Sequence, residues 1–152
     1  MHLAHYLGLL HRAQLNLADA LRQVADAHRD EPDIFHLCRQ QADVCDSHAE
    51  QLQPFAQRYS EEAPQEPDRL HSELFRGTRT GGIGLLRDLQ DLYLMAAECD
   101  ICWTVVGQAA RGARDQPLID VVSGCEAETA IQLAWLRTRM KQAAPQALVV
   151  AD

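Results

Sequence analysis

The sequence predicts an all-α protein, and three observations lead to this prediction. Its 22 Ala and 20 Leu outnumber the 18 Val, Ile and Thr residues together. This balance favours helix, because β-branched side chains lose rotamer freedom against the preceding helical turn. Apolar residues also recur at steps of three and four along four long segments. With 152 residues, the chain is long enough for one such domain and its core.

The first two helices are expected at residues 2–29 and 32–59. Gln14 interrupts the first apolar stripe, which otherwise consists of Leu3, Leu7, Leu10, Leu17, Leu21 and Val24. Asp30 and Pro32 supply a capping acid and a first-turn proline for the second helix. Its stripe comprises Phe35, Cys38, Ala42, Cys45, Ala49, Leu52, Ala56 and Tyr59. Pro54 removes one backbone hydrogen bond and is expected to kink the last turns.

The other two helices are expected at residues 83–111 and 117–141. Between them, Asp115 can cap the fourth helix and Pro117 can occupy its first turn. That helix is expected to end near Gln142, and residues 143–152 to form an apolar tail.

The long connection is expected at residues 60–82, where proline, glycine and charged residues replace the apolar pattern. A short helix is expected within it at residues 67–76. The links between helices are thus short, long and short. This pattern predicts a four-helix bundle at residues 1–142 with one long crossover between helices two and three.

The charge and the cysteine content of the chain indicate which partners and which cellular compartment to expect. The net charge is −8, and the arginines do not cluster, which argues against a nucleic-acid partner. No apolar run approaches the length of a membrane span, so no membrane association is expected. An odd number of five cysteines and no recognisable signal peptide favour reduced thiols and a cytoplasmic location.

A homodimer is also expected, because one bundle cannot easily bury its other large apolar residues as well as the four stripes. These are Tyr93, Trp103, Trp135 and the tail residues Leu148, Val149 and Val150.

Polar and thiol residues interrupt the four stripes near the midpoints of the helices. Antiparallel helices with tight turns bring their midpoints to one level, so these residues are expected to converge. They are Gln14, Cys45, His48, Glu98, Cys125, Glu128 and Gln132.

The chain resembles a diverged, small bacterial member of the ferritin-like and rubrerythrin-like superfamily. The segments DLYLMAAECDICWTVVGQAA and GCEAETAIQLAWL carry the resemblance best. The family implies a di-metal centre, with one Glu from each of two helices and a Glu-x-x-His pair from the other two. Glu98 matches one single-Glu position, but Gln14 occupies the other. Cys45-x-x-His48 keeps only the His of one pair, and Cys125-x-x-Glu128 replaces the other, so oxygen-activating di-iron chemistry is not expected.

Three functions stay open at this stage. The first is a non-catalytic ferritin-like protein with an interaction or stress-related role and no cofactor. Its mid-bundle polar residues Gln14, His48, Glu98, Glu128 and Gln132 then form a hydrogen-bond network, and its cysteines pack as small apolar residues. The second is a metal-binding protein or oxidoreductase holding a single zinc or iron ion through Cys45, His48, Glu98, Cys125 and Glu128.

The third is a small-molecule binder that uses the polar middle of the bundle as a pocket floor. Cys99-x-x-Cys102 has the spacing of a redox pair. It lies in mid-helix, however, where the helix dipole does not lower a thiol pKa. Whether the protein is an enzyme is left undecided by the sequence.

Overall fold

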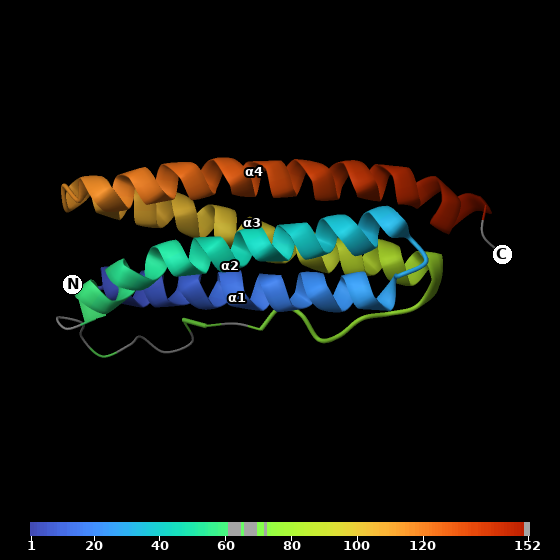
Figure 1. The fold of residues 1–152 in the computed structure, drawn as a ribbon, viewed down its shortest axis with the longest axis horizontal. Coiled ribbons are helices and arrows are strands. Elements are labelled where there is room, and N and C mark those ends of the chain that lie inside the picture. Colours follow the sequence, from blue (N-terminus) through green and yellow to red (C-terminus); the bar gives the residue numbers. More distant parts are fainter. Residues whose placement is uncertain (61–64, 66–69, 72, 151–152) are drawn as a thin grey trace.

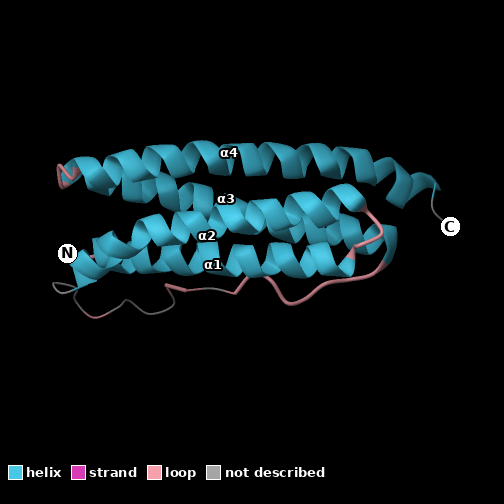
Figure 2. Ribbon diagram, in the orientation of Figure 1, coloured by secondary structure: helices cyan, strands magenta, loops and turns pink. Residues whose placement is uncertain are grey.

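The computed structural model describes residues 1–60, 65, 70–71 and 73–150. It contains four long helices, namely α1 (Leu3–Ala27), α2 (Pro32–Ser60), α3 (Gly81–Gly112) and α4 (Gln116–Pro145). A short π-helix, η1 (Gln146–Val150), follows α4 (Figure 1). The described residues contain no strand (Figure 2), which confirms the all-α prediction. The observed bounds of the first three helices lie within about two residues of those expected from periodicity.

The helices lie side by side along one long axis (Figure 1). α1 packs most extensively against α2 and α3 against α4, while α1 and α3 join the two pairs. The contact between α2 and α4 is the sparsest of the four. One buried cluster of Leu, Ala, Val and Cys side chains fills the space among all four helices. None of the helices, as far as the chain is described, is both long and apolar enough to cross a membrane.

Contacts between helix ends fix the directions of the neighbours. His28, after α1, contacts Asp88 near the start of α3. Arg58, near the end of α2, bonds to Asp115 at the start of α4. α1 and α3 are therefore antiparallel, and so are α2 and α4. It follows that α2 ends at the opposite end of the bundle from the start of α3.

The described part of the connection is not helical. Residues 70–71 and 73–80 have irregular conformation, so the expected short helix at 67–76 is wrong there. Its residues 67–69 and 72 lie outside the described residues. Leu70 and Phe75 pack onto the core, and Gly77 adopts a φ of 114°. Tertiary packing and a left-handed glycine thus override the weak helical signal of this segment.

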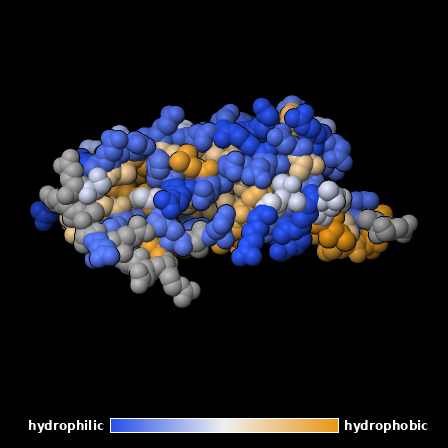
Figure 3. All heavy atoms as spheres, turned by 90° about the horizontal axis from the view of Figure 1, so that it is seen from below, coloured by the Kyte–Doolittle hydropathy of each residue, from blue (hydrophilic) through white to orange (hydrophobic). Residues whose placement is uncertain are grey.

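α4 continues past Gln142, where the sequence suggested that it ends, and reaches Pro145. Ala143 and Ala147 are buried against Leu86 of α3. The tail at 143–150 therefore extends the helix and has a packing partner, because its alanines favour helix and fit against α3. Leu148, Val149 and Val150 are exposed, and apolar side chains gather at this end of the molecule (Figure 3).

Trp103 corrects one basis of the homodimer prediction. Its side chain is 0% exposed within a single bundle. Its ring packs against that of His48 on α2, and its indole N–H donates to Thr129 on α4. Trp103 therefore needs no second subunit for its burial.

Candidate functional site

The middle of the bundle brings four of the predicted polar residues together across α2 and α4. The Nε2 atom of His48 lies 3.4 Å from the Oε2 atom of Glu128. One turn away, the Nε2 atom of Gln132 donates a hydrogen bond to the Sγ atom of Cys45 at 3.4 Å. Cys45 and His48 are one turn apart on α2, as are Glu128 and Gln132 on α4. Because the two helices are antiparallel, His48 lies opposite Glu128 and Cys45 lies opposite Gln132.

A second set of contacts links α3 and α4 beside His48. The indole N–H of Trp103 donates to the Oγ1 atom of Thr129 at 3.0 Å. That hydroxyl donates in turn to the carbonyl oxygen of Cys125 at 2.8 Å. The Trp103 ring packs edge-on against the His48 ring, with centroids 5.7 Å apart. This packing holds the imidazole on the α4 side of the core.

Several buried polar atoms at this level have no hydrogen-bond partner. They include both ring nitrogens of His48, both amide atoms of Gln14 and the Oε1 atom of Gln132. The carboxylate of Glu128 is near His48 but does not meet hydrogen-bond geometry. Because each unsatisfied buried group costs about 1–3 kcal/mol, such a concentration calls for an explanation.

Burial determines the protonation states of these groups. It lowers the pKa of His48, while the charge of Glu128 opposes this shift, so the imidazole is neutral near pH 7. Burial raises the pKa of Cys45 to about 12 and that of Cys125 to about 12. These thiols are therefore protonated and weakly nucleophilic.

The Cys99-x-x-Cys102 pair has the same character. Burial raises the pKa of Cys99 and raises that of Cys102 to about 11. All five cysteines are free and buried. Redox activity requires a low thiol pKa and access, and this pair has neither.

Glu98 lies on a different side of the bundle from the pair formed by His48 and Glu128. It is half-buried in a small cavity beside Arg12 and Asn16 of α1 and His71 of the connection. Burial raises the pKa of the Glu98 carboxyl, and the charge of His71 opposes this. Each helical residue advances about 100° around the axis. Glu98 is therefore rotated by about 100° from its neighbour Cys99, which faces the core.

The predicted metal residues therefore do not form one ligand set. Among the residues that the structure describes, no group of three or more His, Cys, Asp or Glu side chains is arranged to hold a metal ion. His48 and Glu128 are adjacent, Cys45 contacts Gln132, and Cys125 contributes its backbone carbonyl. Glu98 lines a separate cavity and the amide of Gln14 has no hydrogen-bond partner, so the full convergence expected from the sequence is not observed.

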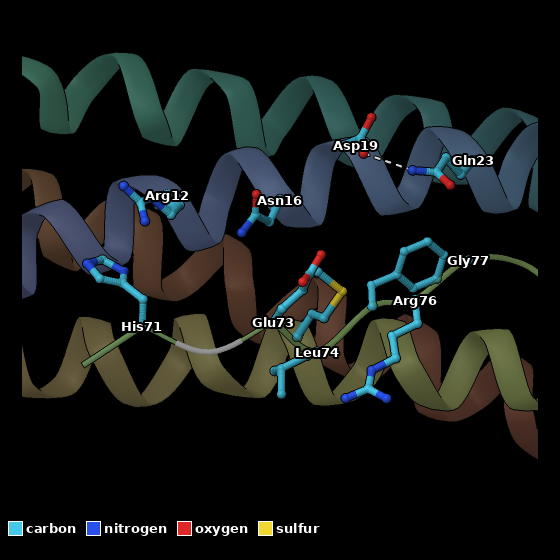
Figure 4. Close-up of a pocket in the computed structure, with 11 residues that line it drawn as sticks. Arg12, Asn16, Asp19, Gln23, His71, Glu73, Leu74, Arg76 and Gly77 are labelled. Carbon is cyan, nitrogen blue, oxygen red and sulfur yellow. Dashed lines mark hydrogen bonds between the residues drawn. The ribbon is translucent and has the colours of Figure 1, made fainter. Parts of the chain in front are cut away.

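A surface cleft of about 650 Å³ lies between α1 and the connection (Figure 4). The α1 side supplies Arg12, Asn16, Asp19 and Gln23, and the connection supplies residues 71 and 73–77. Asn16 and Glu73 point toward one another across it, and Gln23 donates to Asp19 at 2.8 Å. No pattern in the sequence predicted this cleft, although the charged residues in the long connection were a usable signal.

A buried charged cluster holds the connection against the bundle. The fully buried Asp88 lies 2.8 Å from the Nε2 atom of His28. Its carboxylate also accepts hydrogen bonds from the backbone N–H of Arg79 at 3.0 Å and from its Nη1 atom at 2.8 Å. Arg79 Nη1 also donates to Asp91 at 2.8 Å.

Gly84 makes this approach of the connection sterically feasible. A Cβ atom there would lie 3.0 Å from the backbone carbon of Arg79. No pattern in the sequence indicated this cluster, because His28 is 60 residues from Asp88 and the path of the connection is irregular.

Comparison with known proteins gives no relative from which a role can be assigned. No protein-family model, curated protein or solved structure matches the chain.

Proposed function

We propose that this protein is a non-catalytic helical bundle of ferritin-like topology that acts by binding another protein chain along α3. The observation that carries this proposal is a line of four exposed aliphatic side chains on that helix, called here the outer stripe. Ile83, Leu94, Ile101 and Val105 are 60%, 57%, 63% and 41% exposed.

The spacing of the outer stripe places its members on one face. Successive members are separated by 11, 7 and 4 residues, which correspond to about three, two and one helical turns. The opposite face of α3, with Leu92, Cys99 and Trp103, is buried in the core. A helix that is apolar on both its inner and outer faces is typical of one that is covered on both, and large exposed apolar patches mark interaction sites.

The contacts of the helix ends support the ferritin-like topology. α2 ends beside Asp115, and α3 begins beside His28, at the other end of the bundle. The described residues 73–80 run alongside α1 toward the start of α3 (Figure 1). A single long crossover between α2 and α3 is the connection that this arrangement requires.

The electrostatics of the interior support a role without catalysis. The thiols have raised pKa values, and Glu98 is separated from the pair formed by His48 and Glu128. Acid–base and nucleophilic catalysis need such groups within hydrogen-bond reach of one another and of a substrate. The reduced, free cysteines also support a cytoplasmic location.

Site-specific photo-crosslinking in the native host tests the binding role of the outer stripe. A benzoylphenylalanine residue at position 101 should give adducts with a partner chain after irradiation. Leu15, 43% exposed on α1, provides the control position and should give none above background. Equal labelling from both positions, or none from position 101, would refute binding through α3.

A second candidate function is the binding of a single metal ion, zinc or iron, in the middle of the bundle. The unpartnered nitrogens of His48 and the adjacent Glu128 favour it. These two residues would hold the ion, with the unpartnered Oε1 atom of Gln132 as a neighbouring oxygen donor. A metal ion there would supply Lewis-acid chemistry and would satisfy the imidazole. The complete ligand set of a di-metal centre is not present, so no di-iron reaction is proposed.

Elemental analysis of protein purified without a polyhistidine tag tests the metal site. If this second candidate is correct, the wild type carries about one equivalent of metal and His48→Gln loses it. His36, exposed on α2 and remote from Glu128 in sequence, provides a His→Gln control that should retain the metal. A metal-free wild type after growth with added zinc and iron would exclude this candidate.

A further inference from the structure

We propose that the chain bound on the outer stripe is a second copy of this protein, with the two α3 helices packed antiparallel about a two-fold axis at Leu94. This inference rests on the proposed function and names its partner. It concerns the face of α3 opposite its buried residues, and Val105, at one end of this face, also borders an open cleft with Met1 and Tyr6.

The positions of the stripe residues are symmetric about Leu94. Ile83 precedes Leu94 by 11 residues, and Val105 follows it by 11. Eleven residues complete about three helical turns, so the three side chains share one line at intervals of roughly 16 Å. Reversing the helix about Leu94 therefore superimposes Ile83 on Val105 and leaves an apolar side chain at each point.

A two-fold dimer needs this self-complementarity, because both subunits present the same surface. In the antiparallel arrangement, Ile83 packs against Val105 of the partner subunit, and the two Leu94 side chains meet at the axis. Ile101 then lies opposite Arg87 of the partner subunit, whose aliphatic stem can cover it.

The position of Arg87 favours antiparallel over parallel pairing. Its side chain is 50% exposed and lies on α3 one turn from Ile83. Parallel pairing would bring the two Arg87 side chains directly together, which places like charges in contact. Antiparallel pairing separates them by about 14 residues, or roughly 21 Å along the helix.

The charge of the surroundings points to a second copy as well. Gln90, Ala97, Thr104 and Gln108 also lie on this side of α3 and are uncharged. The chain as a whole carries a net charge of −8, so most approaches of two copies are opposed by repulsion. The outer stripe offers an approach with little charge, and depletion of charge is typical of the centre of protein interfaces.

Disulfide trapping tests the axis directly. Leu94→Cys should yield a covalent dimer on treatment with copper phenanthroline, because two identical residues meet only on a two-fold axis. Ile83→Cys and Val105→Cys should each yield none alone. An equimolar mixture of these two variants, after subunit exchange, should yield the cross-linked heterodimer. The wild type is the background control, because its five thiols are buried.

Sedimentation gives a measurement that does not depend on new thiols. The wild type should sediment as a dimer at micromolar concentration, and Leu94→Asp should reduce the mass by half while keeping the helical circular dichroism spectrum. Leu15→Asp, an aliphatic-to-acid change on exposed α1 surface, should leave the dimer intact. A monomeric wild type would overturn the inference.

The outcomes separate this inference from the proposed function. Cross-linking of Ile83→Cys and Val105→Cys each to itself, with no product from their mixture, would refute the antiparallel arrangement. Adducts of position 101 with a different protein, together with a monomeric wild type, would refute the second copy and leave binding through α3 in place. If neither adducts from position 101 nor a dimer is observed, both the inference and the proposed function are refuted.

Discussion

Replacing Asp88 with alanine should lower the free energy of unfolding by about 3–5 kcal/mol, because it breaks a buried charged cluster. Asp88 is fully buried, and its carboxylate contacts His28, the backbone N–H of Arg79 and the Arg79 guanidinium. Without it, His28 and the N–H lose their acceptor, and the cavity left by the carboxylate is too polar to collapse cheaply. Urea unfolding followed by circular dichroism measures the change, at equal protein concentrations because association also contributes.

A surface aspartate provides the control for this substitution. Asp19 is exposed on α1 and accepts one hydrogen bond from Gln23, so Asp19→Ala should change the free energy by no more than about 0.5 kcal/mol. Asp88→Asn keeps the shape and one acceptor oxygen and should give an intermediate loss. If Asp88→Ala cost no more than Asp19→Ala, the cluster would not contribute to stability.

Replacing Trp103 with alanine should lower the free energy of unfolding by about 3–5 kcal/mol, as expected for the loss of a large side chain from a packed core. The indole is fully buried, contacts the His48 ring and donates to Thr129. Its removal leaves a cavity at the level of the unpartnered amides, and the Thr129 hydroxyl loses one of its bonds. Thermal unfolding monitored at 222 nm provides the measurement.

Two further variants separate packing from hydrogen bonding at this position. Trp103→Phe retains much of the ring but loses the N–H, and should cost about 1–3 kcal/mol. Trp135→Ala removes a half-buried indole from α4 and should cost less than Trp103→Ala. An effect of Trp103→Ala smaller than that of Trp135→Ala would contradict the packing described for the mid-bundle core.

Local periodicity was sufficient to predict the helices, because the stripes leave few alternatives for their bounds. It also placed Gln14, His48 and Gln132 in the core, since polar residues on an apolar stripe must be buried with it. Rotation about the helix axis limits this reasoning. Glu98 is a single residue from the core line, and that offset directs it toward α1 and the connection.

The features that escaped prediction depend on contacts between distant residues. Asp88 is 60 residues from His28, and neither residue has a local pattern that names the other. The cleft between α1 and residues 71 and 73–77 depends on the path of an irregular segment, for which no periodicity exists. The clash that a side chain at Gly84 would cause with Arg79 is likewise set by that path.

The Asp88 cluster also bears on the order in which the chain folds. α1 with α2 and α3 with α4 are joined by short turns, so each helical hairpin closes a small loop at low entropic cost. His28 belongs to the first hairpin, Asp88 to the second and Arg79 to the connection between them. The contact between His28 and Asp88 can form only when the hairpins dock, whereas the bonds of Arg79 to Asp88 and Asp91 join residues of one short segment. Subglobal opening that separates the hairpins must therefore break the contact between His28 and Asp88.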